Sequence, residues 1–167
     1  MFKITEKNYK RIINFFRERN WALNALKFCY VFLPLVLFIG YPVLIVYVFF
    51  SNPVYLFKII LIPLGVFLLV TALRKIINEQ RPYEKYNTSS LFGKTTTGQS
   101  MPSRHTASAF IISFAIFYIN VELGIVALSI SLLISLSRVL AGVHFIRDVL
   151  AAMLLSITVG VLFFFII

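Results

Sequence analysis

The feature that most constrains this chain is a set of long apolar runs that contain no charged side chain. The clearest runs extend from Phe28 to Phe50, from Ile59 to Leu73 and from Val149 to Ile167. The first and the last approach the roughly 20 residues that a helix needs to cross a bilayer, and the middle run reaches that length if residues 54–58 join it. The chain is therefore predicted to be an integral membrane protein, with residues 1–167 forming one domain.

Composition and charge lead to the same class of protein. Because 60% of the residues are hydrophobic and only 13% are charged, a soluble domain would have too few polar side chains to cover its surface. The formal net charge is +10, and most basic residues gather before Phe28 and between Arg74 and Arg104. Basic residues beside membrane spans favour lipid phosphates rather than nucleic acid as partners. Cys29 is the only cysteine, which excludes a disulfide or a thiolate metal site within the chain.

The segment ahead of the first span, residues 1–27, is basic and amphipathic. Between Ile4 and Trp21, apolar side chains recur at helical spacing and basic side chains fill most other positions, a pattern typical of a helix at the membrane interface. The alternative is a solvated leader that serves only to set topology.

The order of apolar runs and loop formers predicts an all-α polytopic membrane helical bundle of about five spans. The expected elements are a first span over 28–50 kinked at Pro34 and Pro42, a tight turn at 51–53, a second span ending near Leu73, a polar loop over 74–104, a second helical hairpin over 105–120 and 122–137, and a last span from near Asp148. Both halves of the second hairpin are shorter than a full span, so their ends at His105 and Ser137 are expected slightly inside the bilayer.

Ionisable residues gather at the ends of these predicted spans, and tracing five spans puts them all on one face of the membrane. They are Arg74, Arg81, Arg104, His105, Arg138, His144 and Asp148, which include both histidines and the only aspartate. Ionisable groups at membrane depth are costly and tend to serve function. The region 74–148 is therefore the predicted catalytic region.

The first two clusters have the chemistry of phosphate binding. Arg74 and Arg81 are seven residues apart, which would be two turns and one face of a helix, and planar guanidiniums fit phosphate oxygens. The sequence Pro102-Ser103-Arg104-His105 begins a predicted helix, where unpaired backbone amides favour an anion. Taken alone, Ser103 is equally consistent with a simple helix cap.

The third cluster has the chemistry of a nucleophile. Ser137 and Arg138 precede His144, and Asp148 follows four residues later. One helical turn would let the carboxylate accept a hydrogen bond from one imidazole nitrogen and leave the other as a nucleophile. A lone histidine near an apolar helix is usually structural, and Arg138 alone could simply extend toward the interface. Three clusters on one face argue against both readings.

Together the clusters resemble the three signature motifs of the PAP2 superfamily, which includes lipid phosphatases, bacterial acid phosphatases and vanadium haloperoxidases. The family pattern is Lys, six residues, Arg-Pro; then Pro-Ser-Gly-His; then Ser-Arg, five residues, His, three residues, Asp. The third motif is complete here. Arg74 stands where the family usually has Lys, with Lys75 as the alternative phosphate ligand, and Arg104 stands where it usually has Gly.

The resemblance implies a role for each matching residue. His144 would attack phosphorus, Asp148 would hold His144, and His105 would protonate the leaving oxygen and later activate water. The implied phosphate ligands are Arg74, Arg81, Ser103, the backbone at Arg104, and Arg138. No metal ion and no cofactor are implied.

The function that the resemblance implies is metal-independent hydrolysis of a lipid phosphate or diphosphate through a phosphohistidine intermediate. Undecaprenyl diphosphate, phosphatidic acid and phosphatidylglycerol phosphate stay open as substrates. One alternative is a catalytically degenerate protein that binds lipid phosphates, and a lower-ranked one is a vanadate-dependent haloperoxidase.

The predicted location is a bacterial cell membrane, with the N-terminus and the site on the same face. The charge rule would make that face cytoplasmic, whereas the resemblance favours the outer face, which is the preferred expectation. Oligomeric state is left open.

Overall fold

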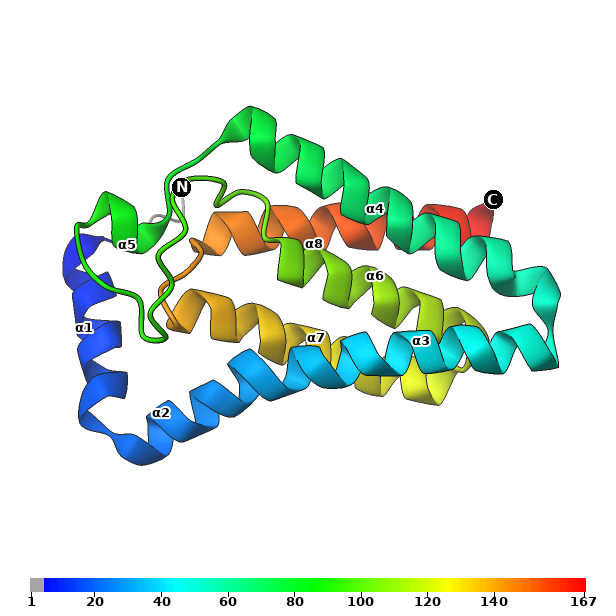
Figure 1. The fold of residues 1–167 in the computed structure, drawn as a ribbon, viewed down its shortest axis with the longest axis horizontal. Coiled ribbons are helices and arrows are strands. Elements are labelled where there is room, and N and C mark those ends of the chain that lie inside the picture. The colour runs from blue at the N-terminus through cyan, green and yellow to red at the C-terminus, as the bar shows by residue number, and fades with distance from the viewer. Residues whose placement is uncertain (1–4) are drawn as a thin grey trace.

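The computed structural model describes residues 5–167, which form a bundle of long helices with one helix lying across its end (Figure 1). The α-helices are α1 (Glu6–Glu18), α2 (Asn20–Lys27), α3 (Leu33–Ser51), α4 (Leu56–Ile77), α5 (Pro82–Lys85), α6 (Arg104–Ile119), α7 (Val121–Leu140) and α8 (Ile146–Val161). Two π-helical segments, η1 (Phe28–Phe32) and η3 (Leu162–Ile166), and the 3₁₀ segment η2 (Pro53–Tyr55) complete the elements. No strand occurs within residues 5–167, so the predicted all-α class is confirmed.

Four helices are long and apolar enough to cross a membrane, and α6, with 16 residues, is a shorter apolar helix. Large apolar side chains such as Phe49, Leu68 and Leu154 are exposed along the bundle. In water such a surface would be an aggregation liability, but it matches the hydrocarbon core of a bilayer. The chain is therefore an integral membrane protein.

The first spanning helix is longer than predicted. It begins at Asn20 rather than Phe28 and runs without interruption through α2, η1 and α3 to Ser51. The helix continues through both Pro34 and Pro42, and the π-helical turn η1 lies just ahead of the first proline. At the far end, the predicted tight turn is present as η2, which leads directly into α4.

The second hairpin differs from the prediction at its C-terminal half. α6 is short as expected, but α7 has 20 residues and extends to Leu140, so its predicted shortness was wrong. Asn120 separates the two helices, and its side-chain oxygen accepts a hydrogen bond from the backbone N–H of Leu123 at 2.9 Å. The last span starts at Ile146, two residues earlier than Asp148.

α6 is the central helix of the bundle and packs against α3, α4, α7 and α8. Its neighbours approach closely where they carry glycine. A Cβ on Gly124 of α7 would lie 2.3 Å from the Cα of Phe117, and a Cβ on Gly160 of α8 would lie 2.6 Å from the ring of Phe114. Small residues at such contacts allow the tight van der Waals packing that holds helices together in lipid.

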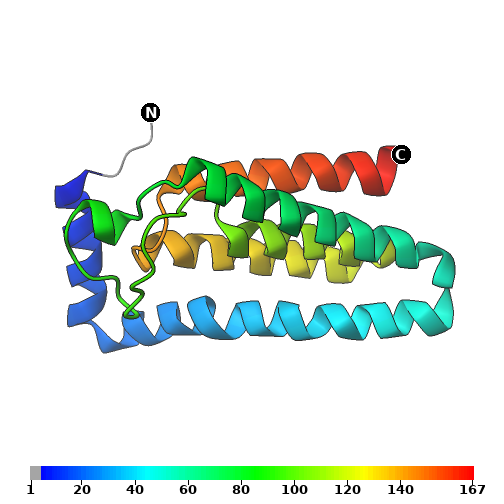
Figure 2. The same ribbon diagram turned by 45° about the horizontal axis from the view of Figure 1, so that its top comes forward.

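α1 lies across the end of the bundle and covers the loops there (Figures 1 and 2). The predicted amphipathic helix is present from Glu6, whereas its predicted start at Ile4 falls outside the described residues and its end at Trp21 belongs to the first span. The break is at Arg19, whose backbone is extended. The buried side chains of α1, Tyr9 and Ile13, point toward the rest of the protein and lie close to Gly142 in the α7–α8 turn.

Candidate active site

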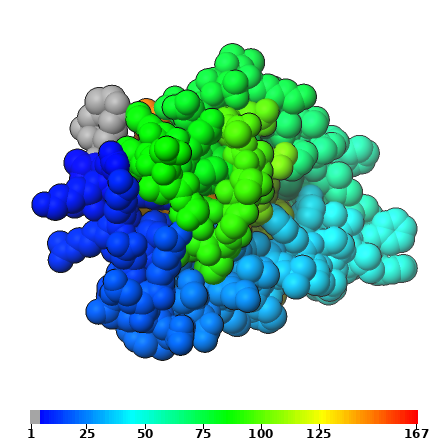
Figure 3. All heavy atoms as spheres, turned by 60° about the vertical axis from the view of Figure 1, so that its left-hand side comes forward, coloured from blue at the N-terminus to red at the C-terminus, as the bar shows by residue number. Residues whose placement is uncertain are grey.

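All three motifs lie at one end of the bundle, where the long loop after α4, the α7–α8 turn and α1 meet. Figure 3 views this end, with α1 in dark blue beside the green loop. α4 and α7 end here while α6 and α8 begin here, so Arg74, His105, Arg138 and Asp148 are brought to the same place by helix direction (Figure 1). The expected single face is therefore one end of the fold.

Arg74 and Arg81 are both buried, but they do not share a helix face. α4 ends before Arg81, because Asn78 adopts a left-handed conformation with φ 42°, so the prediction of one helical face was wrong. A loop carbonyl fixes each guanidinium instead. Arg74 Nη1 donates to the oxygen of Pro102 at 2.9 Å, and Arg81 Nε donates to the oxygen of Gly98 at 3.0 Å. The remaining N–H groups of each fork are left for other acceptors.

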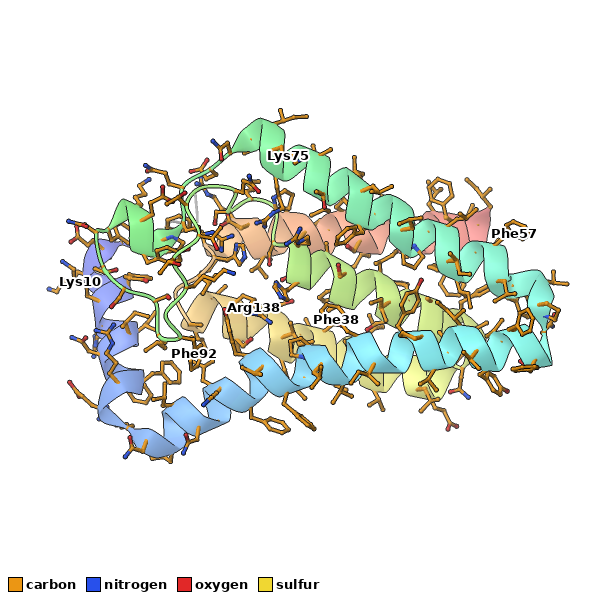
Figure 4. The ribbon with its side chains drawn as sticks, in the orientation of Figure 1. Lys10, Phe38, Phe57, Lys75, Phe92 and Arg138 are labelled. Atoms are coloured by element: carbon orange, nitrogen blue, oxygen red, sulfur yellow. The ribbon has the colours of Figure 1, made fainter. Side chains whose placement is uncertain are left out.

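Lys75, the alternative ligand for Arg74, is exposed on α4, whereas Arg74 is only 6% exposed. Figure 4 labels Lys75. Because successive helical residues point about 100° apart, only one of the two side chains can point into the bundle. The structure places Arg74 there.

Ser103 lies at the N-cap position of α6, yet its side chain makes no capping bond. Its hydroxyl oxygen accepts from Thr106 Oγ1 at 3.1 Å, and the residue is fully buried. The simple helix-cap role is therefore absent. The serine proton stays available to a bound oxygen, beside the first-turn amides that favour an anion.

Arg104 and His105 follow on the first turn of α6. Arg104 is exposed, and its guanidinium carbon lies 5.7 Å from the ring centre of Phe67. His105 is half-buried, with its ring centre 6.3 Å from that of Phe38. The bulky cation that replaces glycine thus extends outward along α4.

His144 and Asp148 are buried together but are not paired as the sequence suggested. His144 lies in the turn before α8 begins, not on the same helical turn as Asp148. Its Nδ1 is 3.7 Å from Asp148 Oδ2, too far for a direct hydrogen bond. Asp148 Oδ2 instead accepts from the backbone N–H of Phe145 at 3.0 Å and from Ser100 Oγ at 2.5 Å. The two side chains are therefore adjacent and within ion-pair distance, but the expected direct hydrogen bond is not formed in this structure.

Arg138 is held by the first spanning helix. Its Nη2 donates to the oxygen of Tyr30 at 2.9 Å, and its guanidinium carbon lies 4.0 Å from the centre of the Tyr30 ring. Phe92 of the loop packs against Tyr30, with 4.7 Å between the two ring centres. Figure 4 labels Arg138 and Phe92. Arg138 Nε is buried and has no hydrogen-bond partner among the described residues. Such a donor is costly unless a ligand completes it.

Electrostatics keep the imidazole of His144 neutral. Burial lowers the pKa of His144 to about 4, and the positive charges of Arg81 and Arg74 act in the same direction, against the raising effect of Asp148. A neutral imidazole retains a lone pair, which a nucleophile or base requires.

Several residues of this end carry no motif signal in the sequence. They are Ser100, which bonds Asp148; Tyr30, which supports Arg138; Arg147, which pairs with Glu79 across the loop; and Lys94 in the loop itself. Ser100 lies only three residues before Ser103, and this proximity to a motif was the one available hint. Within residues 5–167 no group of three or more His, Cys, Asp or Glu side chains is arranged to hold a metal ion.

The fold and the site together define a polytopic membrane protein in which a buried histidine, an aspartate and several arginines gather at one end of the helical bundle. The model of the PAP2 superfamily matches residues 54–167, which contain all three motifs. The chain therefore belongs to the PAP2 superfamily.

A curated relative is the undecaprenyl-diphosphatase BcrC of Bacillus subtilis (strain 168), 34% identical over 86 residues, which are 52% of this chain and 44% of the relative. The chain thus matches less than half the length of that protein. Two crystal structures share the fold. Aquifex aeolicus LpxE has a TM-score of 0.62 at 22% identity, covering 84% of this chain and 92% of its own. A transmembrane PAP2-type phosphatidylglycerolphosphate phosphatase from Bacillus subtilis has a TM-score of 0.55 at 19% identity, covering 94% and 73%.

Proposed function

We propose that this protein is a metal-independent membrane lipid phosphatase that works through a phosphohistidine on His144. The observation that carries the proposal is the buried, neutral His144 beside Asp148, at an end of a membrane bundle where Arg74, Arg81 and Arg138 are anchored by carbonyl groups. Because these guanidiniums are already held in place before a phosphate binds, little free energy is needed to orient them as negative charge develops in the transition state.

The reaction follows in two displacements. The lone pair of His144 forms a bond to phosphorus, and the bond from phosphorus to the leaving oxygen breaks. His105, which takes up a proton when the anionic headgroup binds, gives that proton to the leaving oxygen. Water then attacks the phosphohistidine, with His105 taking a proton, and His144 is released. The arginines, Ser103 and the first-turn amides of α6 stabilise the equatorial oxygens throughout.

An apolar groove offers a place for the lipid tail. It encloses about 480 Å³ between α3, α4 and α6, and its lining includes Phe38 and Phe67. These two rings are the ones beside His105 and Arg104, so the groove begins where the chemistry would occur. A tail in the groove would hold its headgroup at the arginines.

Charge favours a diphosphate headgroup. Partial burial and the nearby Arg81, Arg138, Arg104 and Arg74 lower the pKa of Lys94, which indicates that these five cations lie near one another. Of the acids at this end, Glu79 pairs with Arg147 and Glu84 accepts from the backbone N–H groups of Arg81 and Gly98, so positive charge is in excess here. A lipid diphosphate carries more charge than a monophosphate to offset this excess. The name of the BcrC relative agrees with this choice.

The first experiment measures phosphate release in detergent, with chelator, from undecaprenyl diphosphate, phosphatidic acid and phosphatidylglycerol phosphate. The natural protein is compared with His144→Ala. The natural protein is expected to release phosphate in the presence of chelator and to carry an acid-labile phosphoryl group after reaction with labelled substrate. The variant is expected to do neither. Equal activity of the variant would remove His144 as the nucleophile. Folded protein without activity on every lipid would favour a degenerate binding protein, and bromination with vanadate and peroxide would favour the haloperoxidase.

The headgroup is tested with farnesyl diphosphate and farnesyl phosphate, which share a tail. Arg104→Gly and Lys94→Gln are expected to lower kcat/KM for the diphosphate about tenfold more than for the monophosphate, as lost contacts to a charged group would. Lys7 is exposed on α1, so Lys7→Gln removes one positive charge outside the site and serves as the control. Equal losses on both substrates would oppose a second phosphate site.

The outer face of a bacterial cell membrane is the proposed location of the site. α1 lies at the same end of the bundle as the site (Figure 1), so a label on α1 reports the side. A Lys7→Cys variant that also carries Cys29→Ser has a single thiol. Labelling by an impermeant reagent on intact cells is expected, and labelling only after permeabilisation would place the site inside.

A further inference from the structure

Ser100 lies between the two members of the His–Asp pair. Its hydroxyl oxygen is 2.5 Å from Asp148 Oδ2 and 3.4 Å from His144 Nδ1, whereas the histidine and the carboxylate are 3.7 Å apart. All three residues are buried, with Ser100 and Asp148 fully so. The serine backbone is fixed as well, because its N–H donates to the oxygen of Glu79 at 2.8 Å.

Proton counting gives this arrangement a direction. A carboxylate can only accept, so the single hydroxyl proton of Ser100 must go to Asp148. The serine oxygen can then only accept from His144, and this requires the imidazole proton on Nδ1. With the proton on Nδ1, the lone pair is on Nε2, the nitrogen that would attack phosphorus.

We infer that Ser100 is a positioning residue that relays Asp148 to His144 and fixes the nucleophilic tautomer of the imidazole. The inference rests on the proposed function of His144. As the Nε2–phosphorus bond forms and the leaving oxygen takes its proton from His105, positive charge develops on the imidazole ring. The Nδ1–H then donates more strongly to Ser100, whose own proton strengthens its bond to Asp148. No proton leaves the serine in this step.

A direct His–Asp pair is the competing arrangement. In that case Asp148 would move toward His144 during the reaction, and Ser100 would be one of two additional donors to the carboxylate, with the backbone of Phe145. The two arrangements predict different results when the hydroxyl is removed, because only the relay loses the acceptor of the imidazole proton.

The first test leaves Ser100 unchanged. The chain has two histidines, so nitrogen NMR of tag-free protein in micelles gives two imidazoles, and a His105→Gln variant assigns the His144 signals. At neutral pH the relay predicts that the proton of His144 is on Nδ1. A proton on Nε2 would overturn the inference, and this measurement does not depend on whether any lipid is hydrolysed.

The second test is Ser100→Ala, with Ser113→Ala as the matched control. Ser113 is equally buried and bonds Ser131 at 2.9 Å between α6 and α7, so its loss costs a similar hydrogen bond away from the site. The relay predicts that Ser100→Ala lowers kcat by about 10²-fold, as misplacement of a catalytic group does, while KM changes little because the arginines are untouched. It also predicts loss of the fixed Nδ1–H tautomer.

The pH profile separates the relay from direct pairing. The charged and titratable groups around His144 are Asp148 on α8, Arg74 on α4, Arg81 in the loop and His105 on α6. Without the relay the imidazolium loses stabilisation, so the acid limb of kcat stays in place or moves to lower pH. An acid limb that moves to higher pH, with kcat like that of Ser113→Ala, would show that Asp148 contacts His144 directly and would overturn the inference.

Discussion

Substitution of Gly142 is expected to lower stability and activity, because the turn that carries His144 packs closely against α1. The φ of Gly142 is +72°, and a Cβ there would lie 2.4 Å from the hydroxyl oxygen of Tyr9 and 2.9 Å from the Cδ1 of Ile13. The same tyrosine hydroxyl donates to the carbonyl oxygen of Gly142 at 3.2 Å. Gly142→Ala therefore strains the backbone and displaces α1 from the turn.

The magnitude follows from these two effects. A left-handed conformation costs a residue with a Cβ about 1–2 kcal/mol, and loss of the Tyr9 hydrogen bond costs about 0.5–1.5 kcal/mol. Gly142→Ala is therefore expected to lower the free energy of unfolding by about 1.5–3.5 kcal/mol. Because the turn leads directly into His144, kcat is expected to fall as well.

The assay is reversible unfolding in mixed micelles, alongside phosphate release. Gly65→Ala is the control, because a Cβ on Gly65 meets nothing within 4 Å and alanine favours a helix by about 0.5–1 kcal/mol. Tyr9→Phe removes the closest atom, so Gly142→Ala should cost about 1 kcal/mol less in that background. The reasoning is refuted if Gly142→Ala behaves like Gly65→Ala, or if the two costs are simply additive.

Three further results are expected. Nitrogen NMR of His105→Gln should show His144 titrating near pH 4, below the ordinary 6.5, because burial disfavours the imidazolium; titration near 6.5 would contradict the buried, neutral imidazole. Glu79→Gln, which breaks the ion pair with Arg147, should lower the free energy of unfolding by only about 0.2–1 kcal/mol, because both side chains are about one-third exposed (32% and 31%); a larger loss in the same unfolding assay would mean that the pair is effectively buried. Tyr30→Ala should raise KM for the lipid about 2- to 30-fold by removing the ring under Arg138, whereas Tyr30→Phe should leave KM unchanged; equal effects would exclude the ring contact.

The spans could be predicted because lipid imposes one strong rule, that an apolar run must be helical and about as long as the bilayer is thick. The turn at Asn52-Pro53 and the helix break at Asn120 also follow from local residues. Helix ends were less predictable. α7 continues past Ser137 to Leu140, and the buried Arg138 on its last turn donates to the carbonyl of Tyr30 in the first spanning helix, a long-range contact that no local pattern reveals.

The arrangement within the site depends on the loop and could not be predicted from spacing. Seven residues between Arg74 and Arg81 fit two helical turns, but the left-handed Asn78 ends α4 between them. Four residues between His144 and Asp148 fit one turn, but α8 starts only at Ile146. In both cases the motif spacing is met by a turn and a helix end, and the side chains meet through tertiary contacts.

α1 shows why an amphipathic pattern does not identify what the apolar stripe contacts. The same periodicity suits lipid and protein, because both bury apolar area. Here Tyr9 and Ile13 are buried against the protein. Lys10, on the outer side in Figure 4, is exposed and pairs with Glu6 at 2.6 Å.

The clustered arginines and the loop after α4 stabilise each other. Several buried guanidiniums with one carboxylate would be strongly unfavourable if each stood alone. The loop carbonyls of Pro102 and Gly98 accept from Arg74 and Arg81, and the carbonyl of Tyr30 in the first spanning helix accepts from Arg138. The arginines proposed to bind phosphate therefore also help to fix the path of the loop. The remaining repulsion and the unpaired Nε of Arg138 are what an anionic headgroup would relieve. Substrate binding would therefore stabilise the loop that forms the site, by an amount that grows with headgroup concentration.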